Sequence, residues 1–310
     1  MSWAKNSMVK VTVIGVGNLG SCIAYEIATR GLADELVLVD VIRDLAEGQA
    51  ADIEQAIALR KGIEVFAGNY DDVKGSDLVL VAAGKARTPE MKSRLELLSI
   101  NSHIIKDVAT RIKPFLSKEC IVITLTNPLD IMNYLMWRTL GIERRRVIGS
   151  SSQLDSARFR VLLAKKFHVK PLDIDAYVIG EHGENQVPLF SHVKVFGKPI
   201  SFEEHEKEEL RETLKDYALK VVSKKGATIY APASNTADMA QAILRDERRL
   251  MCCSIVLEGE YGLESVSIGV PAILGRGGAE EIQEWKLAEE EEALFKRGAE
   301  GMKKILQSLF

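Results

Sequence analysis

The stretch "VIGEHGENQVP", residues 178–188, contains the histidine best placed for acid–base chemistry. Glu181 precedes His182 and Gly183 follows it, and the apolar run "DAYVI" leads into this turn. Because an imidazole changes its charge between about pH 5 and 8, a histidine held at the mouth of a site can carry a proton. The alternative is a surface turn that contains a histidine, and this stretch alone does not separate the two.

The stretch "QLDSARFR" places Asp155 and Arg158 at the i,i+3 spacing that puts both on one face of a helix. One interpretation is an exposed ion pair. The apolar residues around them instead favour a partly buried helix, where a carboxylate needs a partner. His182 is a suitable partner, because a carboxylate bonded to one ring nitrogen fixes the tautomer and raises the imidazole pKa. Arg158, with its planar donor fork, suits a substrate carboxylate.

The stretch "AAGKARTPEMKSRLELL", residues 82–98, follows a predicted strand and is rich in cations. They are Lys85, Arg87, Lys92 and Arg94. Together with Gly84 and Pro89, they predict a mobile lid that brings guanidinium groups over an anionic substrate and excludes water. A basic surface loop is the alternative.

The turn "GVGNLG" places Gly15, Gly17 and Gly20 in the G-x-G-x-x-G pattern, after a predicted strand and at the start of a predicted helix. The first glycine permits a tight turn, the second lets the backbone approach a pyrophosphate, and the third lets helix and strand pack closely. The pyrophosphate then faces the N-terminus of the helix. Taken alone, the pattern is also compatible with a simple tight turn.

Asp40 strengthens the dinucleotide interpretation. It ends the second predicted strand, 20 residues after Gly20, where an acid can hydrogen-bond the adenine ribose hydroxyls. A carboxylate there repels a 2′-phosphate, so the sequence favours NAD over NADP, although Arg43 is near enough to weaken that preference. The alternative is an ordinary polar residue at the end of a strand.

Asn127, in "LTNPLD", ends a later predicted strand. At the carboxyl ends of parallel strands, a short polar side chain faces the ligand crevice. The alternative is a turn residue before Pro128.

The elements that position these residues alternate in the first half of the chain, which predicts a doubly wound α/β fold of the Rossmann type. The continuous apolar runs suit parallel strands covered on both faces. Strands are expected at 9–17, 35–40, 63–68, 77–84, 120–128 and 146–150, with helices at 18–30 and 43–60.

The second half predicts an α+β catalytic domain, and we place the boundary so that the domains are 1–149 and 150–310. Helices are expected at 153–167, 202–224, 226–246 and 279–309, and strands at 174–179, 190–196, 251–257 and 266–274.

Composition is typical of a globular protein: 46% hydrophobic, 27% charged, with a net charge of -3. It predicts no nucleic-acid partner and no membrane partner. The four cysteines form no C-x-x-C pair and no zinc-ligand cluster, so we expect no metal and reduced thiols in a cytoplasmic protein.

The motifs occur together in an order that resembles the L-lactate/L-malate dehydrogenase family, most of all its lactate-dehydrogenase-like malate dehydrogenases. The matching motifs are "GVGNLG", "LVLVD", "AAGKAR…SR", "LTNPLD", "LDSARFR", "IGEHGENQVP" and "KKGATIYAPA". The resemblance implies an NAD cofactor and a catalytic group of His182, Asp155 and Arg94. It also implies substrate binding by Arg87, Arg94, Asn127, Arg158 and Thr228, with Pro232 nearby. The cofactor contacts it implies are Gly15, Gly17, Asn18, Leu19, Gly20, Asp40, Gly84, Asn101, Leu125 and Asn127.

The substrate depends on the lid. In this family the third residue after the loop glycine is glutamine with lactate and arginine with malate. Counted from Gly84 this residue is Arg87, which can pair with the second carboxylate of oxaloacetate. Counted back from Arg94 it is Thr88, because the interval is one residue longer than the usual family interval.

The sequence therefore predicts an NAD-dependent malate dehydrogenase that acts on a small dicarboxylate. The first alternative is an L-lactate or other 2-hydroxyacid dehydrogenase, and the second is a non-catalytic dinucleotide-binding protein. The resemblance also implies a homo-oligomer, either a tetramer or a dimer.

Overall fold

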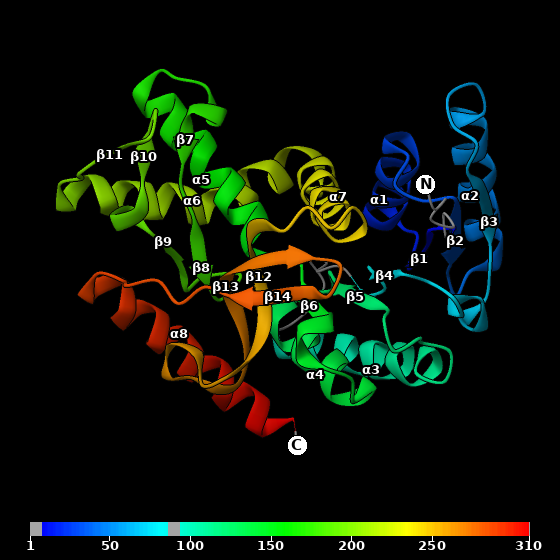
Figure 1. The fold of residues 1–310 in the computed structure, drawn as a ribbon. Coiled ribbons are helices and arrows are strands. Elements are labelled where there is room, and N and C mark those ends of the chain that lie inside the picture. The colour runs from blue at the N-terminus through cyan, green and yellow to red at the C-terminus, as the bar shows by residue number, and fades with distance from the viewer. Residues whose placement is uncertain (1–7, 86–93, 310) are drawn as a thin grey trace, which may run out of the picture.

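The computed structural model describes residues 8–85 and 94–309, and its ribbon is shown in Figure 1. The segment 86–93, which includes the predicted substrate residue Arg87 and its alternative Thr88, lies outside the described residues. Arg94 begins a helix, and its side chain is also outside the description.

The first half alternates strands and helices, as predicted. Its strands are β1 (Lys10–Ile14), β2 (Glu35–Val39), β3 (Glu64–Ala67), β4 (Leu78–Val81), β5 (Ile121–Thr124) and β6 (Val147–Gly149). Its α-helices are α1 (Asn18–Arg30), α2 (Arg43–Ile57), α3 (Arg94–Ile112) and α4 (Leu129–Leu140), and its short 3-10 helices are η1 (Tyr70–Val73) and η2 (Arg144–Arg146).

The six strands of this half are parallel, in the order β3-β2-β1-β4-β5-β6. The strand order reverses between β1 and β4, so a crevice opens there at the carboxyl ends of the strands. Strands such as β4 are buried along their whole length because helices cover both faces of the sheet. In the view of Figure 1, α3 and α4 lie below the strands and α1 lies above them. These features confirm the predicted Rossmann fold.

The second half extends the same sheet with antiparallel strands. Its strands are β7 (Ile174–Asp175), β8 (Val178–Gly180), β9 (Gln186–Pro188), β10 (Lys194–Val195), β11 (Lys198–Pro199), β12 (Arg249–Glu258), β13 (Glu264–Gly275) and β14 (Gly278–Ile282). Its helices are α5 (Ser152–Phe167), α6 (Glu204–Lys225), α7 (Tyr230–Leu244) and α8 (Glu289–Ser308), with short 3-10 helices η3 (Pro171–Asp173), η4 (Phe190–His192) and η5 (Glu260–Gly262).

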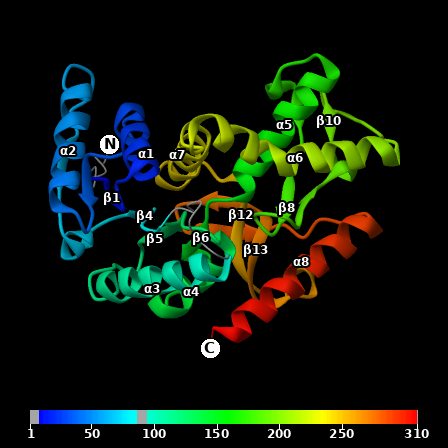
Figure 2. The same cartoon turned by 180° about the vertical axis from the view of Figure 1, so that it is seen from behind.

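Strand β12 joins the two halves, because it pairs with β6 through Ser254 and Gly149. Among the described residues the resulting sheet has 11 strands, in which β12 and β13 form a long antiparallel pair that continues to β8 and β9. Figure 2, the view from behind, shows the long strands between α4 and α5. The sheet thus crosses the domain boundary placed after residue 149, which stays a prediction.

The predicted closing helix, 279–309, is wrong in its first part. Residues Gly278–Ile282 form strand β14, which pairs with the end of β13, and the helix begins only at Glu289. Gly278 has a φ of +88°, and a Cβ there would lie 2.3 Å from the carbonyl oxygen of Arg145. This tight turn returns the chain along β13, and the acidic first turn of α8 then marks a favourable helix start.

The core of the described residues is shared by both halves. One buried cluster runs from Val11 in β1 to Met302 in α8, and a smaller one surrounds Phe159 between α5 and α6. No helix in the described part of the chain is long and apolar enough to cross a membrane.

Candidate active site

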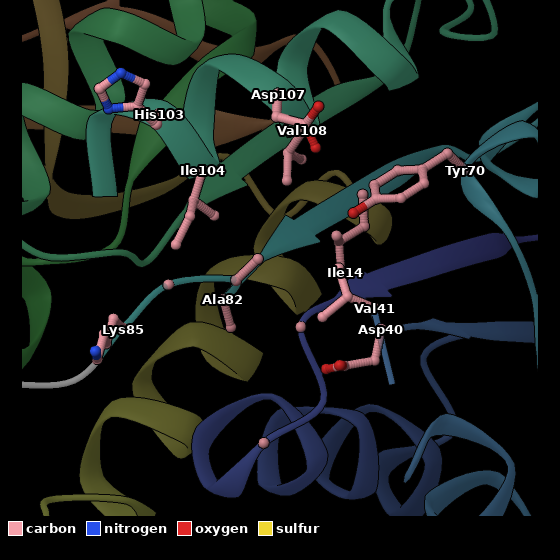
Figure 3. Close-up of a pocket in the computed structure, with 14 residues that line it drawn as sticks. Ile14, Asp40, Val41, Tyr70, Ala82, Lys85, His103, Ile104, Asp107 and Val108 are labelled. Carbon is pink, nitrogen blue, oxygen red and sulfur yellow. The ribbon is translucent and has the colours of Figure 1, made fainter. Parts of the chain in front are cut away.

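A cavity of about 560 Å³ opens at the carboxyl ends of β1, β2 and β4. Figure 3 shows Asp40 on one side of it, opposite Tyr70 and the α3 residues Asp107 and Val108. It is lined by Ile14, Gly15, Gly17, Asp40, Val41, Tyr70, Ala82, Ala83, Gly84, Lys85, His103, Ile104, Asp107 and Val108. The cavity therefore occupies the crevice that the strand order predicts.

The three glycines of the turn meet three different spatial demands. Gly15 has a φ of +86°, and a Cβ there would lie 2.4 Å from the backbone nitrogen of Ala83, which follows β4. A Cβ on Gly20 would lie 1.8 Å from the Gly15 carbonyl oxygen, so α1 can approach the turn only without one. A Cβ on Gly17 would meet nothing within 4 Å. The open space beside Gly17 at the start of α1 fits a pyrophosphate.

The carboxylate of Asp40 is fixed beside this turn. One oxygen accepts a hydrogen bond from the Val16 nitrogen at 2.9 Å, and the other accepts one from the Ile42 nitrogen at 3.0 Å. Arg43 does not line the cavity; its guanidinium bonds Glu47 and the carbonyl oxygens of the β3 end. Of these two charged side chains only that of Asp40 lines the cavity, which fits the expected preference for a ribose 2′-hydroxyl over a 2′-phosphate.

Other predicted cofactor contacts lie around the cavity rather than in its lining. Asn18 is exposed and Leu19 half-buried at the start of α1, while Leu125 is buried after β5. Asn101 on α3 is also buried: its side-chain oxygen accepts from the Lys85 nitrogen at 2.8 Å. Its amide nitrogen donates to the Asn127 carbonyl oxygen at 2.7 Å, so Asn101 ties two loops of the crevice together.

Two elements contribute lining residues that the sequence analysis did not single out. Tyr70 begins η1 directly after β3, and Arg111 lies over its ring at 5.0 Å. On α3, one helix face supplies His103, Ile104, Asp107 and Val108. Their i, i+1, i+4, i+5 spacing is the signal that could have identified this wall from the sequence.

His182, Asp155 and Arg158 form a connected group. The Nδ1 atom of His182 lies 2.7 Å from one Asp155 oxygen, and Arg158 donates to the other oxygen at 3.0 Å. The Asp155 side chain is 4% exposed and that of His182 is 19% exposed, so the group is buried with one accessible imidazole. The interpretation as a surface ion pair is thereby excluded for Asp155 and Arg158.

The charges shift the titration of this group. Burial would raise the pKa of Asp155, but the positive charge of His182, its hydrogen bond and Arg158 outweigh it, so the pKa is lowered. Burial would likewise lower the pKa of His182, but Asp155 reverses this and Asp130 adds to it, so the pKa is raised. The pair therefore favours an imidazolium next to a carboxylate.

The fold holds the two partners in place from both sides. Asp155 lies in the first turn of α5, directly after β6, and His182 follows β8. The Ser156 hydroxyl accepts a hydrogen bond from the Val178 nitrogen at 2.9 Å, which fixes β8 against α5. Gly180, with a φ of +88°, then turns the chain so that His182 returns to Asp155.

The two remaining predicted substrate residues, Asn127 and Thr228, lie in loops. Asn127 is exposed at the end of β5, and the peptide bond between Asn127 and Pro128 is cis. Thr228 is half-buried between α6 and α7, and Pro232 lies in the first turn of α7. Among the described residues, no group of His, Cys, Asp or Glu could hold a metal ion.

Both halves of the chain match known family models. Residues 9–149 match the model described as lactate/malate dehydrogenase, NAD binding domain. Residues 152–310 match the model described as lactate/malate dehydrogenase, alpha/beta C-terminal domain.

L-lactate dehydrogenases and malate dehydrogenases are similar to the chain at nearly the same level of sequence identity. The L-lactate dehydrogenase of Thermoanaerobacter sp. (strain X514) is 37% identical, over 97% of this chain and 99% of that protein. The malate dehydrogenase of Natronomonas pharaonis is 40% identical, over 94% of this chain and 97% of that protein. Among solved structures, the minor L-lactate dehydrogenase of Enterococcus mundtii superposes with a TM-score of 0.93 at 33% identity, covering 98% of this chain and 99% of that one.

Proposed function

The chain belongs to the lactate/malate dehydrogenase family, and within it we propose a malate dehydrogenase that interconverts malate and oxaloacetate with NAD(H). The observation that carries the chemistry is the pairing of His182 with Asp155 at 2.7 Å, with Arg158 on the same carboxylate. The glycine turn and Asp40 fit the cofactor that the family uses.

The proton step belongs to His182. NAD(H), when bound, supplies or accepts the hydride at C2 of the acid. Because Asp155 holds Nδ1 of His182, the Nε2 atom is free to give a proton to the C2 oxygen, or to take one in the reverse direction. Asp155 stabilises the imidazolium form and fixes the ring orientation.

Three further residues bind and orient the acid in this proposal. Arg158, held by Asp155, binds the C1 carboxylate with its planar donor fork. Arg94 and Asn127 stabilise the negative charge that develops on the C2 oxygen, the electrostatic term that contributes most in such sites.

The choice of a dicarboxylate rests on Arg87, which lies outside the described residues. A guanidinium over the substrate pairs with the second carboxylate of oxaloacetate, whereas pyruvate would leave the cation buried without a partner. The start of this segment is fixed, since Asn101 bonds both the nitrogen and the carbonyl oxygen of Lys85. The alternative count, which places Thr88 at this position, supports the second candidate.

That second candidate is an L-lactate dehydrogenase. It is favoured by the L-lactate dehydrogenases among the relatives, which are about as similar to this chain as the malate dehydrogenases are. A rate comparison separates the two, with oxaloacetate or pyruvate as substrate and NADH or NADPH as cofactor, followed by loss of absorbance. We expect oxaloacetate with NADH to react fastest. Equal rates with both acids would reject the malate assignment, and equal rates with both cofactors would reject the role of Asp40.

The proton step has its own control. His182→Asn keeps a polar side chain of similar size but cannot exchange a proton, so it should bind NADH with unchanged affinity and lose roughly 10²–10⁴-fold in turnover. Full turnover by this variant would reject His182 as the acid–base group.

The family also supports a homo-oligomer, a dimer or a tetramer, in the cytoplasm. Sedimentation of the purified protein at several concentrations measures the assembly directly, and a monomer at micromolar concentration would reject it.

A further inference from the structure

Asp130 is a buried carboxylate that the mechanism above does not use. It lies in the first turn of α4, in the helix sequence "LDIMNYLMWRTL", and is 2% exposed. A buried carboxylate lowers stability unless hydrogen bonds or charges compensate for its lost hydration. Its presence in an otherwise apolar helix therefore calls for a specific partner.

That partner is the backbone of the histidine turn. One Asp130 oxygen accepts a hydrogen bond from the His182 nitrogen at 2.7 Å. His182 is thus held at two points, by Asp130 at its main chain and by Asp155 at Nδ1 of its ring. Asp155 can hold the ring in place only if the backbone that carries the ring is also held, and Asp130 holds that backbone.

Helix α4, which carries Asp130, is bonded to the long strands of the sheet. One turn further along the helix, the Asn133 amide donates to the Ser254 carbonyl oxygen at 3.2 Å and to the Ser267 hydroxyl at 2.9 Å. These bonds tie α4 to β12 and β13, which form the long antiparallel pair of the sheet. Just before α4 begins, the carbonyl oxygen of Asn127 is held by the side-chain amide of Asn101.

Asp130 also contributes charge. Burial raises the pKa of Asp130 to about 6, against the opposing effects of the Ser254 hydroxyl and of the His182 nitrogen and ring; Glu181 adds to the rise. Above that pH the group is an anion. The charged groups that act on the His182 ring are then Asp155 and Asp130, which favour its protonated form, and Arg158, which disfavours it.

We infer that Asp130 is a positioning residue, which holds the backbone of His182 in register with Asp155 and supplies a second negative charge to the protonated ring. This inference deepens the proposed function and rests on it. The hydrogen bond of Asp130 goes to the His182 backbone nitrogen, so in this role Asp130 acts through His182 and contacts neither acid nor cofactor.

Two substitutions at one position separate the anchor from the charge. Asp130→Asn keeps an oxygen that can accept from the His182 nitrogen but removes the charge. Asp130→Ala removes both. We expect turnover to fall in the order wild type, Asp130→Asn, Asp130→Ala, with roughly a 100-fold loss of kcat for Asp130→Ala, because a displacement of about 1 Å has such an effect in positioned sites. The KM for NADH should not change.

The matched control is Asn133→Ala, which removes a fully buried polar side chain from the next turn of the same helix. Its hydrogen bonds go to β6, β12 and β13 and not to the histidine turn. This variant measures how far the loss of other α4 hydrogen bonds changes turnover and the titration of His182. We expect a loss of stability without a change in the titration of His182.

The charge effect has a defined sign. Removing an anion that favours imidazolium lowers the pKa of His182, so in Asp130→Asn oxo-acid reduction should decline at a lower pH than in wild type. Hydroxy-acid oxidation, which needs neutral His182, should begin at a lower pH. In Asn133→Ala, the pH dependence of both reactions should be the same as in wild type. Profiles that coincide for wild type and Asp130→Asn would reject the charge role.

A second readout does not depend on turnover. Diethyl pyrocarbonate reacts with neutral imidazole, so the pH dependence of its reaction with His182 measures the titration of that ring in the intact protein. Fragment-ion mass spectrometry separates His182 from its neighbours in sequence, His168 and His192. We expect the reaction curve to move to lower pH in Asp130→Asn and to stay in place in Asn133→Ala.

The outcomes distinguish this inference from the proposed function. If wild type turns over neither acid, the proposed function fails, and the shift in the reaction curve still tests the effect of Asp130 on His182. If Asp130→Ala raises the KM for NADH while kcat stays at the wild-type value, Asp130 acts on the cofactor half and the positioning role is wrong. Equal shifts in Asp130→Asn and Asn133→Ala would also overturn it.

Discussion

At the scale of single residues, Asp155 is central because it contacts both His182 and Arg158. One of its oxygens accepts from His182 and the other from Arg158, and its side chain is 4% exposed. A buried carboxylate with two cationic partners stabilises the folded state only while the partners stay charged. In the proposed function the same pair carries the proton, so activity and stability depend on the same groups.

We predict that Asp155→Asn destabilises the protein more at pH 6 than at pH 9. The raised pKa of His182 gives a stabilisation that is complete below its unfolded value of 6.5 and is lost as pH rises through the folded pKa. The lowered pKa of Asp155 gives a second stabilisation, which is present above the unfolded pKa of 3.8 and is lost as pH falls through the folded pKa. At pH 6 both are present, and the loss should be roughly 3–5 kcal/mol.

Urea unfolding of wild type and Asp155→Asn at the two pH values measures this difference. At pH 9 part of the difference should remain, because Arg158 is still charged and still needs the carboxylate. A pH-independent difference would contradict the coupling between His182 and Asp155.

In the proposed function, the choice between oxaloacetate and pyruvate depends on Arg87. Arg87→Gln should lower the ratio of kcat/KM for oxaloacetate over pyruvate by at least about 100-fold, since a site that needs a polar partner rejects analogues lacking it by about 10⁴. Lys92→Gln, a neutralisation in the same segment, is the control and should leave the ratio near that of wild type. If Arg87→Gln also leaves it there, Lys85 or Thr88 takes the discriminating role.

Asp155 and Asp130 show what a sequence reveals about single residues. Asp155 was recognisable because "LDSAR" combines an i,i+3 cation with a known family motif. Asp130 was not, because its partner is the backbone nitrogen of His182, 52 positions away in sequence, and backbone groups leave no residue signature. It is the last residue of the motif "LTNPLD", but locally it is only a carboxylate in the first turn of an apolar helix, which also describes an ordinary helix start.

At the scale of elements, the glycines of the turn between β1 and α1 have different tasks: we expect Gly20 to matter for stability and Gly17 for cofactor binding. Gly20→Ala places a Cβ against the Gly15 carbonyl oxygen, and backbone cannot move aside as a flexible side chain does. We predict a loss of stability of about 1–3 kcal/mol, measured by urea unfolding. Gly17→Ala meets no protein atom, so it should fold like wild type but bind NADH at least roughly tenfold more weakly, measured by NADH fluorescence.

Gly48→Ala is the control for both variants. Gly48 is exposed within α2, and a Cβ there meets nothing within 4 Å. Alanine at this position should leave NADH binding unchanged and stabilise the protein by about 0.5–1 kcal/mol. If Gly17→Ala binds NADH as well as Gly48→Ala does, the space beside Gly17 is not the pyrophosphate site.

The same elements explain which parts of the fold were predictable. Strands such as β2 and β4 are continuous apolar runs closed by glycine or aspartate, so their type and place follow from local pattern. Strand β14 was mistaken for helix because "GAEEI" contains good helix formers, and its pairing with β13 is a tertiary contact. The segment 86–93 lies outside the described residues, so the predicted lid stays a prediction.

At the scale of the whole molecule, the two halves share a sheet and a core. The pairing of β6 with β12 joins the sheets, and Asn133 on α4 bonds Ser254 and Ser267 in the second half. On the other face, Arg30 on α1 bonds Asp238 and Ser234 on α7 at 2.5 and 2.9 Å. Neither half can lose its packing without exposing buried surface of the other, so the free energy of cofactor binding should stabilise both.

We therefore predict one cooperative unfolding transition that NADH shifts as a unit. Trp137 on α4 reports on the first half, and Trp285, which stacks on His192 at 4.9 Å, reports on the second. Two variants isolate these reporters: Trp3→Phe with Trp285→Phe, and Trp3→Phe with Trp137→Phe. Their denaturant midpoints, measured at one protein concentration, should coincide. NADH at 100 times its Kd should add about 2.7 kcal/mol to the free energy of unfolding seen by either reporter. Two separate transitions, with only the Trp137 signal responding to NADH, would show instead that the halves unfold independently despite their shared sheet.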